Sequence, residues 1–312
     1  MAMHLITVDD ELSTRMRNMS FFAACLVTLI HVGIDFDLTP KWFLHTVRFG
    51  LYNIAVPWFF FAAGFFLVPR LVVGNMIGEW KVALMRRFYT LLIPYVAFNI
   101  IAFALKALSG GAGVEIIEIF GLNFNTYPAY KLLWFVRVLM MLVVVSPCFA
   151  MIIKMNRWVS WALVVVSFVL YYALRDIYDQ VPLGVFYFVL DMHLRCYGEA
   201  IIKSRKLWPI VFVGAWMLAV HGVAFVVGVL LTMMGVFSIV GPWPIPKVLT
   251  QNSFAIYLLH GIILYAIHRV IAEPGIAGHF AIGALTIALS VFVVAMTRRF
   301  TPCIVTLLLG GR

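Results

Sequence analysis

The chain has 312 residues, of which 64% are hydrophobic and only 12% are charged, and its mean hydropathy is +1.04. Soluble domains are about half apolar and about a quarter charged, so this composition excludes an ordinary soluble protein and indicates a membrane protein. The net charge of +10 does not indicate a nucleic-acid binder, because the basic residues lie between apolar runs and do not cluster on one soluble face. The four cysteines lack metal-ligand spacing, so we expect no metal site.

The sequence predicts about ten transmembrane helices, because a run of roughly 20 apolar residues crosses a bilayer core. In chain order these runs occupy residues 19–34, 48–68, 87–108, 131–153, 157–174, 182–202, 207–221, 223–240, 248–269 and 277–297. The seventh and eighth runs form one apolar tract, which we divide at His221 and Gly222 because one helix does not readily absorb its length. No linker or repeat is visible, so we expect a single all-α integral membrane domain over residues 1–312.

The distribution of basic residues predicts the orientation of these helices. When the loops are assigned alternately from the N-terminus, fifteen lysines and arginines fall on one side and five on the other, with three inside the helices. Basic residues accumulate in cytoplasmic loops, so both termini are expected to be cytoplasmic, as a leader over 1–18 and a tail over 298–312. The leader has no cleavable signal pattern, and the first helix should remain as an anchor. The longest inner loop is expected from Pro69 to about Arg86, and the longest outer loop over 109–130.

Ionisable residues inside a membrane are costly and are therefore candidates for function. Within the predicted helices we single out His31, Lys106, Arg137, Asp191, His193, Arg195, Glu199, His221 and His260. His31 lies eleven residues after Ser20, which is roughly 17 Å along a helix and in the outer half of the membrane. A neutral imidazole can accept and return a proton near pH 7, as acyl transfer to a hydroxyl requires. Alternatively, His31 is a helix-end residue that is hydrogen-bonded to Asp35.

Two further sets of charged residues each allow two interpretations. Arg137 either extends its guanidinium to the outer headgroups or binds an anion within the helix bundle. Asp191, Arg195 and Glu199 are four residues apart and share one helix face, which predicts a ladder of ion pairs. The ladder is either an internal structural feature or part of a functional site.

Arg86 and Arg87 precede the third predicted helix at its cytoplasmic end. Paired basic residues at this boundary are ordinary membrane anchors. Arginine also binds phosphate groups readily, so the pair could instead hold a phosphorylated cofactor that approaches from the cytoplasm. Pro94 is expected to kink the helix that follows and to open space beside it.

Several segments carry a pattern when they are taken together in chain order. They are LVTLIHV at the end of the first helix, AVPWFFFAAGFFL at 55–67, RRFYTLLIPY at 86–95, LLWFVRVLMMLVVVSP at 132–147, NSFAIYLLHGIIL at 252–264 and the C-terminal LLLGGR. The combination resembles the acyltransferase family 3 membrane proteins, which acylate cell-surface glycans and antibiotics. Family members usually carry an arginine eleven residues before the first-helix histidine, where this chain has Ser20 with Arg17 nearby. They also carry a serine where this chain has Ala63.

The resemblance implies an O-acyltransferase of the bacterial inner membrane, surrounded by membrane lipid and without a nucleic-acid partner. The donor would be acetyl-CoA or a related acyl-CoA supplied from the cytoplasm, and the acceptor a hydroxyl of a lipid-linked or surface glycan. His31 would be the general base, and Arg17, Arg86 and Arg87 would bind the phosphates of the donor.

Further residues of the acyl and substrate site also follow from the resemblance. They are Asp35, Arg137, Ser253, Tyr257 and His260, and the last three share one helix face. Arg137 would stabilise an oxyanion or orient the acyl group. The alternative function is a multi-pass transporter or flippase that exports a saccharide. That class is expected to show inverted repeats or paired broken helices, and the sequence contains no convincing internal repeat.

Overall fold

The computed structural model describes residues 5–108, 128–178, 180–220, 222–271 and 274–301, apart from the side chains of 175–178. Every regular element in these ranges is a helix, which confirms the all-α prediction. A helix satisfies its backbone hydrogen bonds within one segment, as a chain in hydrocarbon requires. His221, most of the predicted outer loop (109–127) and the LLLGGR ending lie outside the described residues.

The chain divides into two compact units, which are described separately. Unit 1 is built mainly on Ala63–Tyr197, and unit 2 on Ile6–Ala62 and Gly198–Met296. The helix α2 (Ala55–Val73) begins in unit 2 and ends in unit 1.

The further helices of unit 1 follow one another closely along the chain. They are α3 (Met76–Arg87), η3 (Phe88–Leu92), α4 (Ile93–Leu108), η4 (Lys131–Leu133), α6 (Trp134–Met155), α7 (Arg157–Tyr178) and α8 (Gln180–Tyr197). The helix α8 packs against both α6 and α7. Between α7 and α8, the Ser160 hydroxyl and His193 Nδ1 are 2.7 Å apart, and the ring of Trp161 lies 4.4 Å from the His193 ring. His193 is therefore a buried residue with a structural partner.

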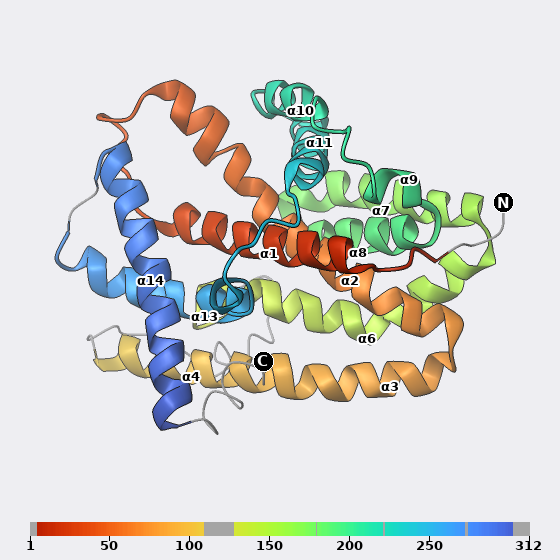
Figure 1. Ribbon diagram of the computed structural model, residues 1–312, viewed down its shortest axis with the longest axis horizontal. Coiled ribbons are helices and arrows are strands. Elements are labelled where there is room, and N and C mark those ends of the chain that lie inside the picture. The colour runs from red at the N-terminus through yellow and green to blue at the C-terminus, as the bar shows by residue number, and fades with distance from the viewer. Residues whose placement is uncertain (1–4, 109–127, 179, 221, 272–273, 302–312) are drawn as a thin grey trace. The chain divides into compact units, whose positions relative to one another are not determined.

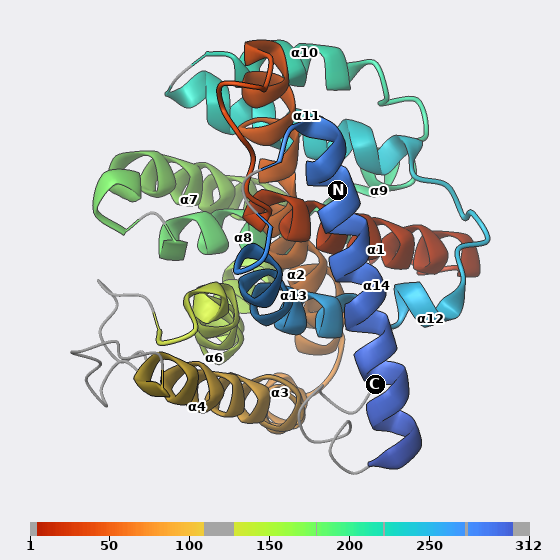
Figure 2. The same cartoon turned by 90° about the vertical axis from the view of Figure 1, so that its left-hand side faces the viewer.

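Unit 2 contains the helix that carries His31 and the last helices of the chain. They are α1 (Asp10–His31), η1 (Phe43–Arg48), η2 (Leu51–Ile54), α9 (Glu199–Ile202), α10 (Ile210–Leu218), α11 (Val223–Ile239), α12 (Lys247–Thr250), α13 (Ser253–His268) and α14 (Ile276–Phe300). Figures 1 and 2 both show α10 and α11 side by side. Their close approach depends on glycines, because a Cβ on Gly228 would lie 3.0 Å from the Gly214 carbonyl oxygen.

A helix lies at each of the ten positions where the sequence predicts one. Five continuous helical segments among the described residues are long and apolar enough to cross a membrane: Phe43–Val73, Met76–Leu108, Lys131–Met155, Arg157–Leu174 and Ile276–Phe300. The division of the long apolar tract is confirmed, since α10 ends at Leu218 and Gly222 has a φ of 78° before α11. With nine residues, however, α10 is about 14 Å long and too short to cross the bilayer core alone. Ten spans, cytoplasmic termini and a single domain stay predictions.

The predicted inner loop from Pro69 to Arg86 is wrong, because this stretch is mostly helical. The helix α2 continues through Pro69 to Val73, and α3 begins after Asn75, whose side chain accepts a hydrogen bond from the Gly78 amide. The predicted leader is also largely helical, since α1 begins at Asp10. These helices begin and end at capping residues, which a scan for apolar runs does not detect.

The segment before Pro94 forms the π-helix η3. A proline ring in a regular α-helix clashes with the carbonyl four residues earlier, and the wider π-helical turn relieves that clash. The helical segment therefore continues past Pro94 to Leu108.

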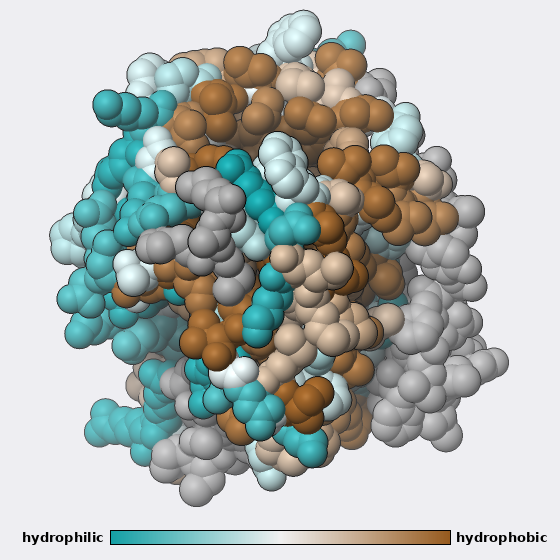
Figure 3. Space-filling model, turned by 90° about the vertical axis from the view of Figure 1, so that its right-hand side faces the viewer, coloured by the Kyte–Doolittle hydropathy of each residue, from teal (hydrophilic) through white to brown (hydrophobic). Residues whose placement is uncertain are grey.

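Large hydrophobic side chains remain exposed, as in a protein that is surrounded by lipid. Figure 3 shows them gathered over a broad area of one face. On α7 they include Val165, Val166, Val169 and Leu170, each between 48% and 56% exposed. A soluble protein rarely exposes so much contiguous apolar surface, so the structure supports a membrane protein.

Candidate active site

The helix that carries His31 begins at a capping residue. The Asp9 carboxylate accepts a hydrogen bond from the Leu12 amide at 2.8 Å, and acidic residues occupy the first turn, as the helix dipole favours. The helix α1 ends at His31, because Val32 adopts an extended backbone. The structure therefore places the exposed side chain of His31 on the last residue of α1.

His31 lies beside a second imidazole, that of His260 on α13. The two ring centroids are 5.3 Å apart, and the ring of His260 is fully buried. His260 Nδ1 lies 2.6 Å from the Tyr257 carbonyl oxygen and 3.3 Å from that of Ile256. Since carbonyls only accept hydrogen bonds, Nδ1 carries the proton and the neutral ring presents Nε2 as an acceptor. Among the described residues, His260 Nε2 has no hydrogen-bond partner.

The prediction that Ser253, Tyr257 and His260 share one face of a helix is confirmed. All three side chains are buried on α13, which packs against α1 (Figure 1). The Tyr257 ring lies 5.9 Å from the His260 ring, whereas the Ser253 hydroxyl donates to the Thr250 carbonyl oxygen at 3.0 Å. Tyr257 thus adjoins the histidine pair directly, and Ser253 lies two turns further from it along α13.

Ser20, which replaces the usual arginine of the resembling family, is hydrogen-bonded within unit 2. Its hydroxyl donates to the Met16 carbonyl oxygen at 2.8 Å and accepts from Trp58 Nε1 at 3.1 Å. The fully buried Trp58 ring also lies 4.9 Å from the Phe237 ring. Ser20 therefore orients an aromatic side chain in the core of unit 2.

The two arginines of α1 take different positions. Arg15 is buried and donates from Nε to the Val240 carbonyl oxygen and from Nη2 to that of Phe237, each at 3.1 Å. It thereby caps the C-terminal end of α11. Arg17, the predicted phosphate ligand, is exposed and donates to the Thr14 hydroxyl at 2.9 Å.

Asp35 does not hydrogen-bond to His31, so that alternative is wrong. Its Oδ1 accepts hydrogen bonds from the amides of Asp37 at 2.8 Å and Leu38 at 3.2 Å. The helix ends at His31, so Asp35 does not follow one helical turn later as the prediction required. The side chain instead stabilises its own turn.

The other predicted site residues of the chain lie in unit 1. Arg137 is buried on α6, and its Nη2 donates to Gln180 Oε1 at 3.5 Å. Its guanidinium does not extend to the lipid headgroups, and that interpretation is wrong. Arg86 and Arg87 form the last turn of α3, with Arg86 exposed and Arg87 half-buried.

The predicted ladder of Asp191, Arg195 and Glu199 is wrong. Asp191 is fully buried, and neither carboxylate oxygen has a hydrogen-bond partner among the described residues. The Arg195 guanidinium lies 4.3 Å over the Phe65 ring. Glu199 belongs to the separate helix α9, which begins after Gly198, and it pairs with Lys203 at 2.8 Å. The four-residue spacing predicts one continuous helix, and Gly198 interrupts it.

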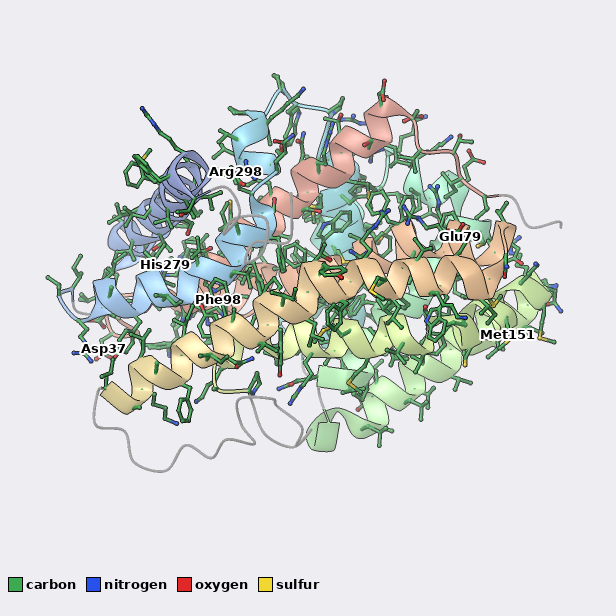
Figure 4. The ribbon with its side chains drawn as sticks, turned by 90° about the horizontal axis from the view of Figure 1, so that it is seen from below. Asp37, Glu79, Phe98, Met151, His279 and Arg298 are labelled. Atoms are coloured by element: carbon green, nitrogen blue, oxygen red, sulfur yellow. The ribbon has the colours of Figure 1, made fainter. Side chains whose placement is uncertain are left out.

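Two histidines that the sequence analysis passed over contact the segment after His31. His268 Nε2 accepts a hydrogen bond from the Gly33 amide at 3.2 Å, and His279 Nδ1 lies 3.4 Å from the Gly33 carbonyl oxygen. His279 is fully buried near the start of α14, and Figure 4 shows it at the same end of its unit as Asp37. Both histidines fall inside predicted spans, so a complete search of those spans for titratable residues finds them. Among the described residues, no group of three or more metal-ligating side chains is present.

A comparison with protein-family models identifies the chain. The family model described as an acyltransferase domain, Acyl_transf_3, matches residues 17–297. The chain therefore belongs to the acyltransferase family 3, and the resemblance noted in the sequence is confirmed. Searches of curated proteins and of solved structures found no match.

The family and the structure together define the class of protein. The match covers most of the chain and includes both α1 and α13, the helices of the histidine pair. The protein is an acyltransferase enzyme with apolar helices suited to a membrane. Neither the described structure nor the comparisons support the alternative of a transporter.

Proposed function

We propose that the protein transfers an acetyl or similar acyl group from a cytoplasmic acyl-CoA to a hydroxyl of a cell-envelope or extracellular glycan. The reaction takes place in the bacterial inner membrane, and His31 is the general base. The observation that carries the proposal is the pair of imidazoles at the end of α1, one exposed and one buried, 5.3 Å apart. An exposed imidazole beside a buried acceptor nitrogen can receive a hydroxyl and remove its proton.

The chemical step follows from this arrangement. The acceptor hydroxyl approaches His31 and is oriented by a hydrogen bond to His260 Nε2, whose Nδ1 proton is held by the Tyr257 carbonyl. As the hydroxyl oxygen forms its bond to the thioester carbonyl carbon, His31 takes the hydroxyl proton. The carbon–sulfur bond then breaks, the ester is released, and His31 returns the proton to the departing CoA thiolate.

The donor requires a separate binding region for its phosphates. In unit 1, Arg86 is exposed and Arg87 half-buried in the last turn of α3, and guanidinium groups bind phosphate through paired hydrogen bonds. In unit 2, Arg17 is exposed on α1. We assign the phosphate contacts to these three residues. The buried Arg137 is proposed to orient the acyl group, with Gln180 holding its guanidinium.

The test is a His31→Ala variant expressed in membranes at the same level as the wild type. Removal of a general base lowers the rate by about 10²- to 10⁴-fold, so surface glycans should lose the added acyl mass in mass spectrometry. His45→Ala is the matched control, because His45 is also an exposed histidine of unit 2. Undiminished acylation by His31→Ala rules out the proposed base. Absence of acyl-CoA binding to the purified wild-type protein rules out the proposed donor.

A further inference from the structure

The backbone that follows His31 is held by side chains from three other parts of unit 2. Arg48 Nη1, at the end of η1, donates to the Val32 carbonyl oxygen at 3.0 Å. His268, the last residue of α13, accepts the Gly33 amide at 3.2 Å. His279 Nδ1, near the start of α14, lies 3.4 Å from the Gly33 carbonyl oxygen. Both polar groups of Gly33 are therefore engaged by imidazoles.

The protonation of each imidazole follows from its partners. Because the Gly33 amide donates to His268 Nε2, this nitrogen is unprotonated. The Gly33 carbonyl only accepts, so His279 Nδ1 carries a proton and donates it. The Tyr52 hydroxyl lies 3.2 Å from His279 Nε2 and donates to it. The chain from Tyr52 through His279 to Gly33 thus runs in one direction of donation.

Packing around these bonds restricts the same segment. His279 is fully buried, and its ring stacks on that of Tyr52 with an angle of 7° between the planes. Val32 packs in a cluster with Leu264 of α13 and Ile282 of α14. Buried polar groups with complete hydrogen bonding rigidify their surroundings, so this network fixes the backbone at the end of α1.

We infer that Arg48, His268 and His279 are positioning residues, which hold Val32 and Gly33 and thereby orient the imidazole of His31. The inference rests on the proposed role of His31 as general base. These residues touch the backbone next to His31 and not the reacting atoms. Their effect is on geometry, and a misplacement of about 1 Å can lower a rate by about 10²-fold.

The test combines amide hydrogen exchange with kinetics on the purified full-length protein. His268→Leu removes the acceptor of the Gly33 amide, and His279→Leu removes the donor to its carbonyl. Both should accelerate exchange at Gly33 and lower kcat by about 10- to 100-fold, with an unchanged KM for acyl-CoA. His279→Asn should restore much of kcat, because its amide nitrogen can lie near the position of Nδ1. His45→Leu, at an exposed histidine of η1, should change neither quantity.

The outcomes separate this inference from the proposed function. Wild-type exchange at Gly33 in both leucine variants overturns it, as does faster exchange with an unchanged kcat while His31→Ala is inactive. If His279→Leu does not fold, Tyr52→Phe provides the same test, because it removes only the hydroxyl that holds His279 Nε2. If His31→Ala remains active, the proposed base is wrong, and the hold on Gly33 is then decided by the exchange rates alone.

Discussion

Replacement of His260 tests whether its buried nitrogen takes part in the reaction. In His260→Asn the side-chain amide nitrogen can lie near the position of Nδ1 and keep the bond to the Tyr257 carbonyl, which is 2.6 Å long in the native protein. The acceptor at Nε2 is lost. His260→Gln extends further and can place its amide oxygen near the position of Nε2, so it should partly restore that acceptor.

The expected magnitude follows from the kind of bond that is removed. One neutral hydrogen bond contributes about 0.5–1.5 kcal/mol, which corresponds to a roughly 2- to 13-fold loss in kcat/KM for the acceptor. Removal of a general base costs far more, about 10²- to 10⁴-fold. The predicted order of activity is therefore wild type, His260→Gln, His260→Asn and, well below these, His31→Ala.

The assay is transfer of a radiolabelled acyl group to the acceptor by purified protein, with kcat/KM measured for each variant. His193→Asn is the control for the loss of a buried histidine, because His193 is bonded to Ser160 and lies in unit 1. If His260→Asn is as inactive as His31→Ala, the roles of the two imidazoles are not those proposed. If His260→Asn has the wild-type kcat/KM, its Nε2 does not orient the hydroxyl.

Two further predictions concern unit 1. The double variant Arg86→Ala, Arg87→Ala should raise KM for acyl-CoA at least about tenfold with an unchanged kcat; Arg70→Ala is the exposed-arginine control, and an equal rise with acyl-pantetheine, which lacks the nucleotide phosphates, contradicts the assignment. The pair Asp191→Asn, Arg195→Met should leave stability unchanged or raise it by about 1–4 kcal/mol, because it removes two buried charges that form no ion pair with each other; a lower midpoint of thermal unfolding shows that the charges are stabilising.

The positions of the helices could be predicted from the sequence, because apolar length alone determines where a helix can lie in a membrane. The same reasoning failed at Pro69, which was taken as the end of a span although α2 continues to Val73. Proline prevents a regular backbone bond but does not always end a helix whose surroundings stabilise it. Capping by Asn75 likewise depends on one side chain and leaves no trace in hydropathy.

The candidate site could be predicted only in part. His31 and His260 were found because a histidine in an apolar run is conspicuous, and helical spacing correctly grouped Ser253, Tyr257 and His260. Spacing could not show that Asp35 would turn onto its own backbone. The contact of His279 with Gly33 joins residues 246 positions apart, and only the packing of α14 in unit 2 brings them together.

Ser20 changes which cation can act near His31. Where relatives usually carry an arginine, this chain has a hydroxyl that is satisfied by Met16 and Trp58. Arg15 does not replace that arginine, because Nε and Nη2 are bonded to the end of α11. Arg48 has a different position, since its Nη1 donates to the carbonyl of the residue that follows His31. In this chain, therefore, the guanidinium bonded next to the proposed base comes from η1, and the first helix contributes the histidine alone.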